Sequence, residues 1–132
     1  MLKLLIVEDD PSFREILKEF LSWKSPGAVI EEAMDGRGAL MKVRSFRPDL
    51  ILMDIGLPDE SGLSLIRKIK AGDSTARIIM LTSFDSPEYR KAAMLNRADG
   101  FFVKGSIRFE ELLVMLNSFL PTSQGVTGAA QG

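Results

Sequence analysis

Short apolar runs alternate along the chain with segments in which apolar residues recur every three or four positions. The apolar runs have the length and composition of buried strands and lie at 3–7, 29–33, 49–53, 78–82 and 100–103. A regular alternation of strands and helices is typical of a domain built on a parallel sheet. The pattern therefore predicts an α/β domain of five strand–helix units.

The first and last helical segments have the clearest apolar stripes. The first stripe has the i, i+3, i+4, i+7, i+8 spacing of one helix face and consists of Phe13, Ile16, Leu17, Phe20 and Leu21. The last stripe repeats this logic with Phe109, Leu112, Leu113, Leu116 and Leu120. Asp10 and Pro11 suit the cap and first turn of the first helix. Shorter stripes lie at 39–43 and 65–69, whereas the weak stripe at 87–95 predicts the least firmly packed helix.

The two ends of the chain carry different signals. Residues 121–132 are small and polar without any stripe, so we expect residues 1–120 to form the domain and 121–132 to form a flexible tail or the start of a linker. The N-terminus has no signal-peptide pattern, and no apolar run approaches the roughly 20 residues of a membrane span. We expect a cytoplasmic protein that does not contact a membrane.

Composition narrows the chemistry more than the net charge does. With 17 basic and 18 acidic residues, nothing in the total charge points to nucleic acid. The sequence contains neither cysteine nor histidine, which excludes disulfides, thiolate ligands and imidazole groups. Any chemistry must therefore use carboxylates, hydroxyls and lysines.

Polar side chains follow four of the five predicted strands. Glu8 and Asp9 follow the first strand, Asp54 the third and Lys104 the fifth, while Thr82 ends the fourth. Because the carboxyl ends of parallel strands meet at one edge of a sheet, these side chains should converge there. Clustered carboxylates repel one another unless a divalent cation or protons neutralise them. The pattern therefore predicts a functional site at this edge.

The residue types at these strand ends suit phosphoryl transfer. Oxygen ligands such as Asp9, Asp54 and a backbone carbonyl are those that Mg²⁺ prefers. A carboxylate can also attack phosphorus to form an aspartyl phosphate, which makes Asp54 the candidate acceptor. Lys104 and Thr82 are suitable partners for the added negative charge.

Four segments of the sequence resemble the receiver domains of two-component response regulators, over roughly residues 2–120. The segments are Ile-Val-Glu-Asp-Asp at 6–10, Leu-Met-Asp-Ile-Gly-Leu-Pro-Asp-Glu-Ser-Gly at 52–62, Leu-Thr-Ser at 81–83 and Ala-Asp-Gly-Phe-Phe-Val-Lys at 98–104. Each segment alone is a weak pattern, but all four in this order are specific. The resemblance implies a flavodoxin-like, doubly wound sheet of five parallel strands in the order 2-1-3-4-5, with five flanking helices.

The resemblance also implies roles for individual residues. Asp54 would be phosphorylated by a sensor histidine kinase, a phosphotransfer protein or a small acyl phosphate, with Thr82 and Lys104 holding the phosphoryl group. The implied ligands of Mg²⁺ are Glu8, Asp9, Asp54 and the carbonyl of Gly56. Phosphorylation would draw Thr82 toward the phosphate and turn Phe101 inward. This movement would reshape the face of the fourth helix, fifth strand and fifth helix, which binds partners or forms a homodimer, and this domain itself would bind no nucleic acid.

The sequence departs from the family pattern at a few positions. Gly105 follows Lys104 where many receivers have proline, so we expect a freer backbone before the last helix. Gly56 leaves one rim of the site without a side chain, while Phe84 places an aromatic ring on the opposite rim. We expect Phe84→Ala to change the lifetime of the phosphoryl group.

Three other functions compete with a phosphorylated receiver. A phosphatase of the haloacid dehalogenase type needs a second acid two residues beyond the nucleophile, where this chain has Gly56. A flavin carrier of the flavodoxin type needs amide and hydroxyl donors where this chain has Glu8, Asp9 and Asp10. A degenerate receiver that binds partners without phosphorylation remains open. We predict a switch that phosphorylates itself and slowly hydrolyses the product, not a metabolic enzyme.

Overall fold

The computed structural model describes residues 2–72, 74–83 and 85–119, and it contains one sheet. The sheet has five parallel strands in the order β2-β1-β3-β4-β5, which confirms the predicted topology. The strands are β1 (Lys3–Val7), β2 (Val29–Ala33), β3 (Leu50–Asp54), β4 (Arg77–Thr82) and β5 (Gly100–Val103).

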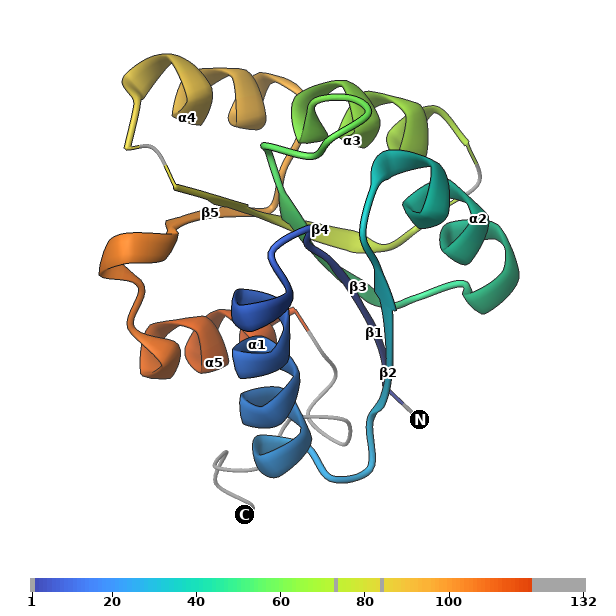
Figure 1. Ribbon diagram of the computed structural model, residues 1–132, viewed down its shortest axis with the longest axis vertical. Coiled ribbons are helices and arrows are strands. Elements are labelled where there is room, and N and C mark those ends of the chain that lie inside the picture. The colour runs from blue at the N-terminus through green and yellow to red at the C-terminus, as the bar shows by residue number, and fades with distance from the viewer. Residues whose placement is uncertain (1, 73, 84, 120–132) are drawn as a thin grey trace.

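Helices cover both faces of this sheet. They are α1 (Pro11–Lys24), α2 (Gly36–Phe46), α3 (Gly62–Ala71), α4 (Pro87–Leu95) and α5 (Phe109–Ser118), with a short 3-10 turn, η1 (Lys104–Ser106), before α5. Figure 1 shows α2, α3 and α4 on one side of the sheet and α1 and α5 on the other. None of the helices in the described residues is long and apolar enough to cross a membrane.

Alternate residues of the central strands pack into two separate cores. Ile51, Met53 and Met80 point into the core shared with α2, α3 and α4, whereas their neighbours along the strands point into the core shared with α1 and α5. Phe101 and Phe102 divide in the same way between the two cores. Burial on both faces explains why the strands appear in the sequence as continuous apolar runs.

Several elements differ in detail from the sequence predictions. β3 extends through Asp54, whose Cα pairs with Leu81, whereas the apolar run predicted an end at Met53. Ile16 is 48% exposed, so only part of the predicted α1 stripe reaches the core. In α4 the single buried residue is Ala93, in agreement with the weak stripe. Leu120, Phe84 and the predicted tail at 121–132 lie outside the described residues.

Aspartate side chains fix the starts of the helices nearest the predicted site. Asp10 caps α1, and its Oδ1 accepts a hydrogen bond of 3.0 Å from the amide of Ser12. α2 is capped locally by Asp35 and also by Asp59, which lies in the β3–α3 loop. The two oxygens of Asp59 accept hydrogen bonds from the amides of Gly36, at 2.8 Å, and Arg37, at 3.0 Å. Asp59 therefore ties the loop after Asp54 to the start of α2.

Candidate functional site

The ends of β1 and β3 bring two acidic residues together. Val7 pairs with Met53 in the sheet, so Glu8 and Asp54 follow neighbouring positions on adjacent strands. The amide of Glu8 continues the ladder by donating to the carbonyl of Ala33 at 3.0 Å. The backbone of both acidic residues is therefore held by the sheet itself.

Three carboxylates gather at this edge of the sheet. Glu8, Asp9 and Asp54 each offer one oxygen, and these oxygens lie within 4.8 Å of one another. Glu8 is fully buried and Asp54 is 5% exposed, whereas Asp9 is exposed. The cluster thus has a buried floor and one acid on the solvent side.

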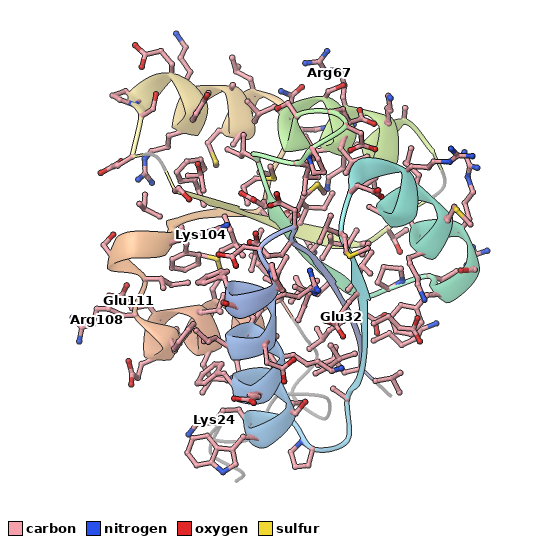
Figure 2. All side chains as sticks on the ribbon, in the orientation of Figure 1. Lys24, Glu32, Arg67, Lys104, Arg108 and Glu111 are labelled. Carbon is pink, nitrogen blue, oxygen red and sulfur yellow. The ribbon has the colours of Figure 1, made fainter. Side chains whose placement is uncertain are left out.

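Lys104 places a positive charge against the buried acids. Its Nζ lies 2.7 Å from Glu8 Oε1 and 3.3 Å from Asp54 Oδ2. The same ammonium lies 5.0 Å from the centre of the Phe13 ring, at the start of α1. Figure 2 shows Lys104 beside the loop that joins β1 to α1. The ammonium that follows β5 therefore meets the acids that follow β1 and β3, as the strand-end pattern requires.

Burial and charge pairing shift the protonation of this cluster. Burial raises the pKa of Glu8 to about 7, although pairing with Lys104 and the amide of Asp10 opposes the shift. Burial alone would lower the pKa of Lys104, but pairing with Glu8 and the charge of Asp54 leave that pKa raised. Lys104 therefore remains an ammonium at neutral pH, while Glu8 takes up a proton at a higher pH than an exposed glutamate does.

The carboxylate cluster suits a hard divalent cation. Glu8 Oε1 is buried, and its close partner among the described residues is the Lys104 ammonium, at 2.7 Å. A bound cation could take the place of that ammonium at this oxygen. The ligand set of Glu8, Asp9 and Asp54 contains only oxygen, as Mg²⁺ prefers. These three side chains could hold such an ion.

The other predicted site residues lie around this cluster. Gly56 is exposed, and its amide donates a hydrogen bond of 3.2 Å to Asp54 Oδ1. Thr82 is 1% exposed and follows Leu81, the sheet partner of Asp54. Phe101 pairs with Met80 on the neighbouring strand and is partly exposed. The strands that carry Thr82 and Phe101 therefore adjoin the site. Thr82 pairs with Val103, the last residue of β5, whereas Phe101 lies two residues earlier in that strand.

Sequence reasoning missed supporting roles of three residues. Arg14 Nη1 donates a hydrogen bond of 2.8 Å to the Glu8 carbonyl, and Arg14 Nε pairs with Glu32 at 3.0 Å. Phe13 was assigned only to the α1 stripe, and no sequence signal reveals its contact with Lys104. A Cβ atom on Gly62 would collide with the Asp54 carbonyl oxygen and lie 2.9 Å from Ile55 Cα. The glycine that follows Ser61 offered a signal for a turn, but not for this close approach.

Known proteins share this sequence pattern. The sequence model of the response regulator receiver domain matches residues 4–117. Over 124 residues the chain is 35% identical to the two-component response regulator PhoP of Pseudomonas aeruginosa. The aligned region covers 94% of this chain and 54% of that protein. Over 113 residues it is 39% identical to a gliding motility regulatory protein of Myxococcus xanthus. That aligned region covers 84% of this chain and 14% of the relative. The chain thus spans about half or less of these curated relatives.

The fold has close counterparts among solved structures. The response regulator protein TrrA of Thermotoga maritima, solved in complex with Mg²⁺-BeF, is 36% identical and superimposes with a TM-score of 0.79. The superposition covers 91% of this chain and 100% of that one. With the family match over 4–117 and the same order of strands, the chain belongs to the receiver domain family of two-component response regulators.

Proposed function

We propose that this domain is the phosphoacceptor of a two-component signalling system and that Asp54 receives the phosphoryl group in a Mg²⁺-dependent reaction. The observation that carries the proposal is the position of the Asp54 carboxylate, beside a buried acid, an exposed acid and an ammonium. This arrangement combines a nucleophile with positive charge and with oxygen ligands for a cation. Glu8, Asp9 and Asp54, with the carbonyl of Gly56, are the proposed ligands.

Phosphoryl transfer at this site would use the protein groups already described together with a bound divalent cation. A carboxylate oxygen of Asp54 forms a new bond to phosphorus while the bond from phosphorus to the donor breaks, and its electron pair leaves with the donor. A bound divalent cation would neutralise charge on the phosphoryl oxygens. Lys104 would transfer its pairing to one of those oxygens, and Thr82 would donate a hydrogen bond to another. Asp54, Thr82 and Lys104 are therefore the proposed reacting and stabilising residues.

The same residues account for a long-lived product. Hydrolysis of an aspartyl phosphate requires a water molecule activated by a base, and the chain has no histidine and a glycine at position 56. We assign no metabolic reaction to the domain, and its own chemistry is self-phosphorylation followed by slow hydrolysis.

The proposed output is a change of surface. The phosphoryl group would favour the arrangement in which Thr82 and Phe101 have moved. The size of this shift would equal the difference between its interaction free energies with the moved and the resting arrangements. The affected face comprises α4, β5 and α5, and we propose that it binds partners or a second copy. The donor would be a sensor histidine kinase, a phosphotransfer protein or a small acyl phosphate. We propose domain limits of 1–120, with 121–132 as a tail or linker.

Intact-protein mass spectrometry tests the proposal directly. The parent protein, incubated with acetyl phosphate and Mg²⁺, should gain the mass of one phosphoryl group, and the gain should disappear with EDTA or in Asp54→Asn. Glu19→Gln is the control, because Glu19 is an exposed acid in α1 and does not belong to the acidic cluster. A parent that gains no mass would support a phosphorylation-independent binding module instead, and an equal gain in Asp54→Asn would refute the assigned acceptor.

A further inference from the structure

The guanidinium of Arg90 lies over the ring of Phe101. Arg90 is in α4, and its Cζ is 4.6 Å from the centre of the Phe101 ring in β5. Arg90 Nη2 is also 3.4 Å from Oδ1 of Asp85, which lies in the loop between β4 and α4. One arginine therefore connects the segment that follows Thr82 with the aromatic residue of the neighbouring strand.

The sheet register relates this contact to Thr82. Phe101 pairs with Met80, and both side chains pack on the side of the sheet covered by α4. Thr82 is two residues beyond Met80, so strand alternation directs its side chain to the same side. Arg90 thus binds the ring on the face where the proposed movement of Thr82 and Phe101 takes place.

A cation over an aromatic face favours the orientation of the ring that keeps the contact. Arg90 is 51% exposed, so the effect belongs to the weaker, solvent-exposed class, which shifts an equilibrium about two- to fivefold. The ion pair with Asp85 limits the positions that the guanidinium can take. If Phe101 turns inward, its face leaves Arg90 and this stabilisation of the resting arrangement is lost.

We propose that Arg90 is a positioning residue that holds Phe101 in its resting orientation and so sets how readily the domain switches. The inference rests on the proposed function, because it assumes that ligands of Asp54 favour the inward ring. A ligand that binds the switched arrangement better binds more weakly when that arrangement is rare. Weakening the Arg90 contact should therefore strengthen binding at Asp54, although Arg90 does not touch the acidic cluster in the described part of the chain.

Beryllofluoride with saturating Mg²⁺, a mimic of the phosphoryl group, provides the test. Its affinity is measured by two-dimensional NMR titration for the parent, Arg90→Gln and Lys91→Gln, a matched control that removes an exposed charge from the next position of α4. Arg90→Gln should bind about two- to fivefold more tightly than the parent. Lys91→Gln should bind like the parent, and the urea midpoints of the two variants should agree.

A double-mutant cycle assigns the effect to the ring. In a Phe101→Leu background, Arg90→Gln should no longer change the affinity, because the contact is already absent. An unchanged affinity in Arg90→Gln alone, or an equal gain in the Phe101→Leu background, would overturn the positioning role while the parent still binds beryllofluoride. A parent that fails to bind beryllofluoride would overturn the proposed function and this inference together.

Discussion

Lys104 Nζ lies 2.7 Å from Glu8 Oε1 and is farther, at 3.3 Å, from Asp54 Oδ2. The ammonium therefore pairs more closely with Glu8, which is fully buried, than with Asp54, the proposed acceptor. A cation bound by the same acids would compete with Lys104 for Glu8 and release the ammonium toward Asp54. The lysine thus has a structural role in the metal-free protein and a chemical role in the proposed reaction.

Replacing Lys104 should uncover that structural role. Lys104→Met keeps the length of the side chain but leaves Glu8 and Asp54 without a positive partner, which should lower the free energy of unfolding by about 3 kcal/mol at pH 8 in EDTA. Mg²⁺ should restore more stability in the variant than in the parent. Urea denaturation with EDTA and with Mg²⁺ measures both effects. Lys91→Met, at an exposed position, is the control, and equal stability of the two variants in EDTA would contradict the role.

Gly62 should tolerate no side chain. In Gly62→Ala the new Cβ would meet the backbone of Asp54 and Ile55, which cannot move without displacing the acceptor, so we expect a loss of about 1–3 kcal/mol in the free energy of unfolding. Phosphoryl uptake from acetyl phosphate should slow as well. Gly105→Ala is the matched substitution, because its Cβ would have open space and should leave stability unchanged or slightly higher. Similar urea midpoints for the two variants would rule out the close approach.

The capping of α2 by Asp59 should depend on pH. Hydrogen bonds from the amides of Gly36 and Arg37 lower the pKa of Asp59. The folded protein therefore holds a proton there less readily than the unfolded chain, so this stabilisation is present above about pH 4 and is lost as pH falls through the lowered value. Asp59→Asn should lower the urea midpoint at pH 7 and at pH 5.

The difference between the parent and Asp59→Asn should shrink below pH 4. Glu19→Gln removes a charge from an exposed acid in α1 and should follow the parent throughout. A difference that stays constant down to pH 3 would show that the carboxylate charge does not contribute to the cap.

The hydroxyl of Thr82 should couple phosphorylation to the proposed output face. Thr82→Ala should accept the phosphoryl group on Asp54 more slowly, and loss of a hydrogen bond to a charged group should reduce the preference for the switched arrangement about tenfold or more. Hydrogen exchange of α4 and β5 amides, with and without beryllofluoride, measures that preference. Thr82→Ser keeps the hydroxyl and should respond like the parent. A full response in Thr82→Ala would remove Thr82 from the switch.

The alternation of apolar runs and helical stripes predicted the α/β class, and the strand ends predicted the meeting of the acids with Lys104, whereas the strand order came from the resemblance to receiver domains. The first, third and fifth apolar runs are followed at once by residues of the cluster, and a parallel sheet places those ends together. β3 extends one residue beyond its apolar run, through Asp54, because backbone pairing with Leu81 continues the strand whatever the polarity of the side chain. The helical spacing places Ile16 on the apolar face of α1, but Ile16 is 48% exposed. Spacing shows which way a stripe faces, and it does not show how much of the stripe the rest of the protein covers.

Contacts that loops and helices make with distant elements could not be predicted from the sequence. Asp59 caps a helix that starts 23 residues earlier, and Arg90 meets a ring on the next strand. Such contacts depend on how loops and helices pack against the sheet. Neither the period of apolar residues nor the spacing of motifs specifies that packing. The expectation for Phe84 remains a prediction, because that residue lies outside the described part of the chain.

The separation of the apolar interior into two cores bears on how a change in one layer can reach the other. Phe101 packs on the side covered by α4, while Leu81 and Phe102 pack against the helices of the opposite side. Because the proposed output face takes α4 from one layer and α5 from the other, repacking in either core would alter part of that face.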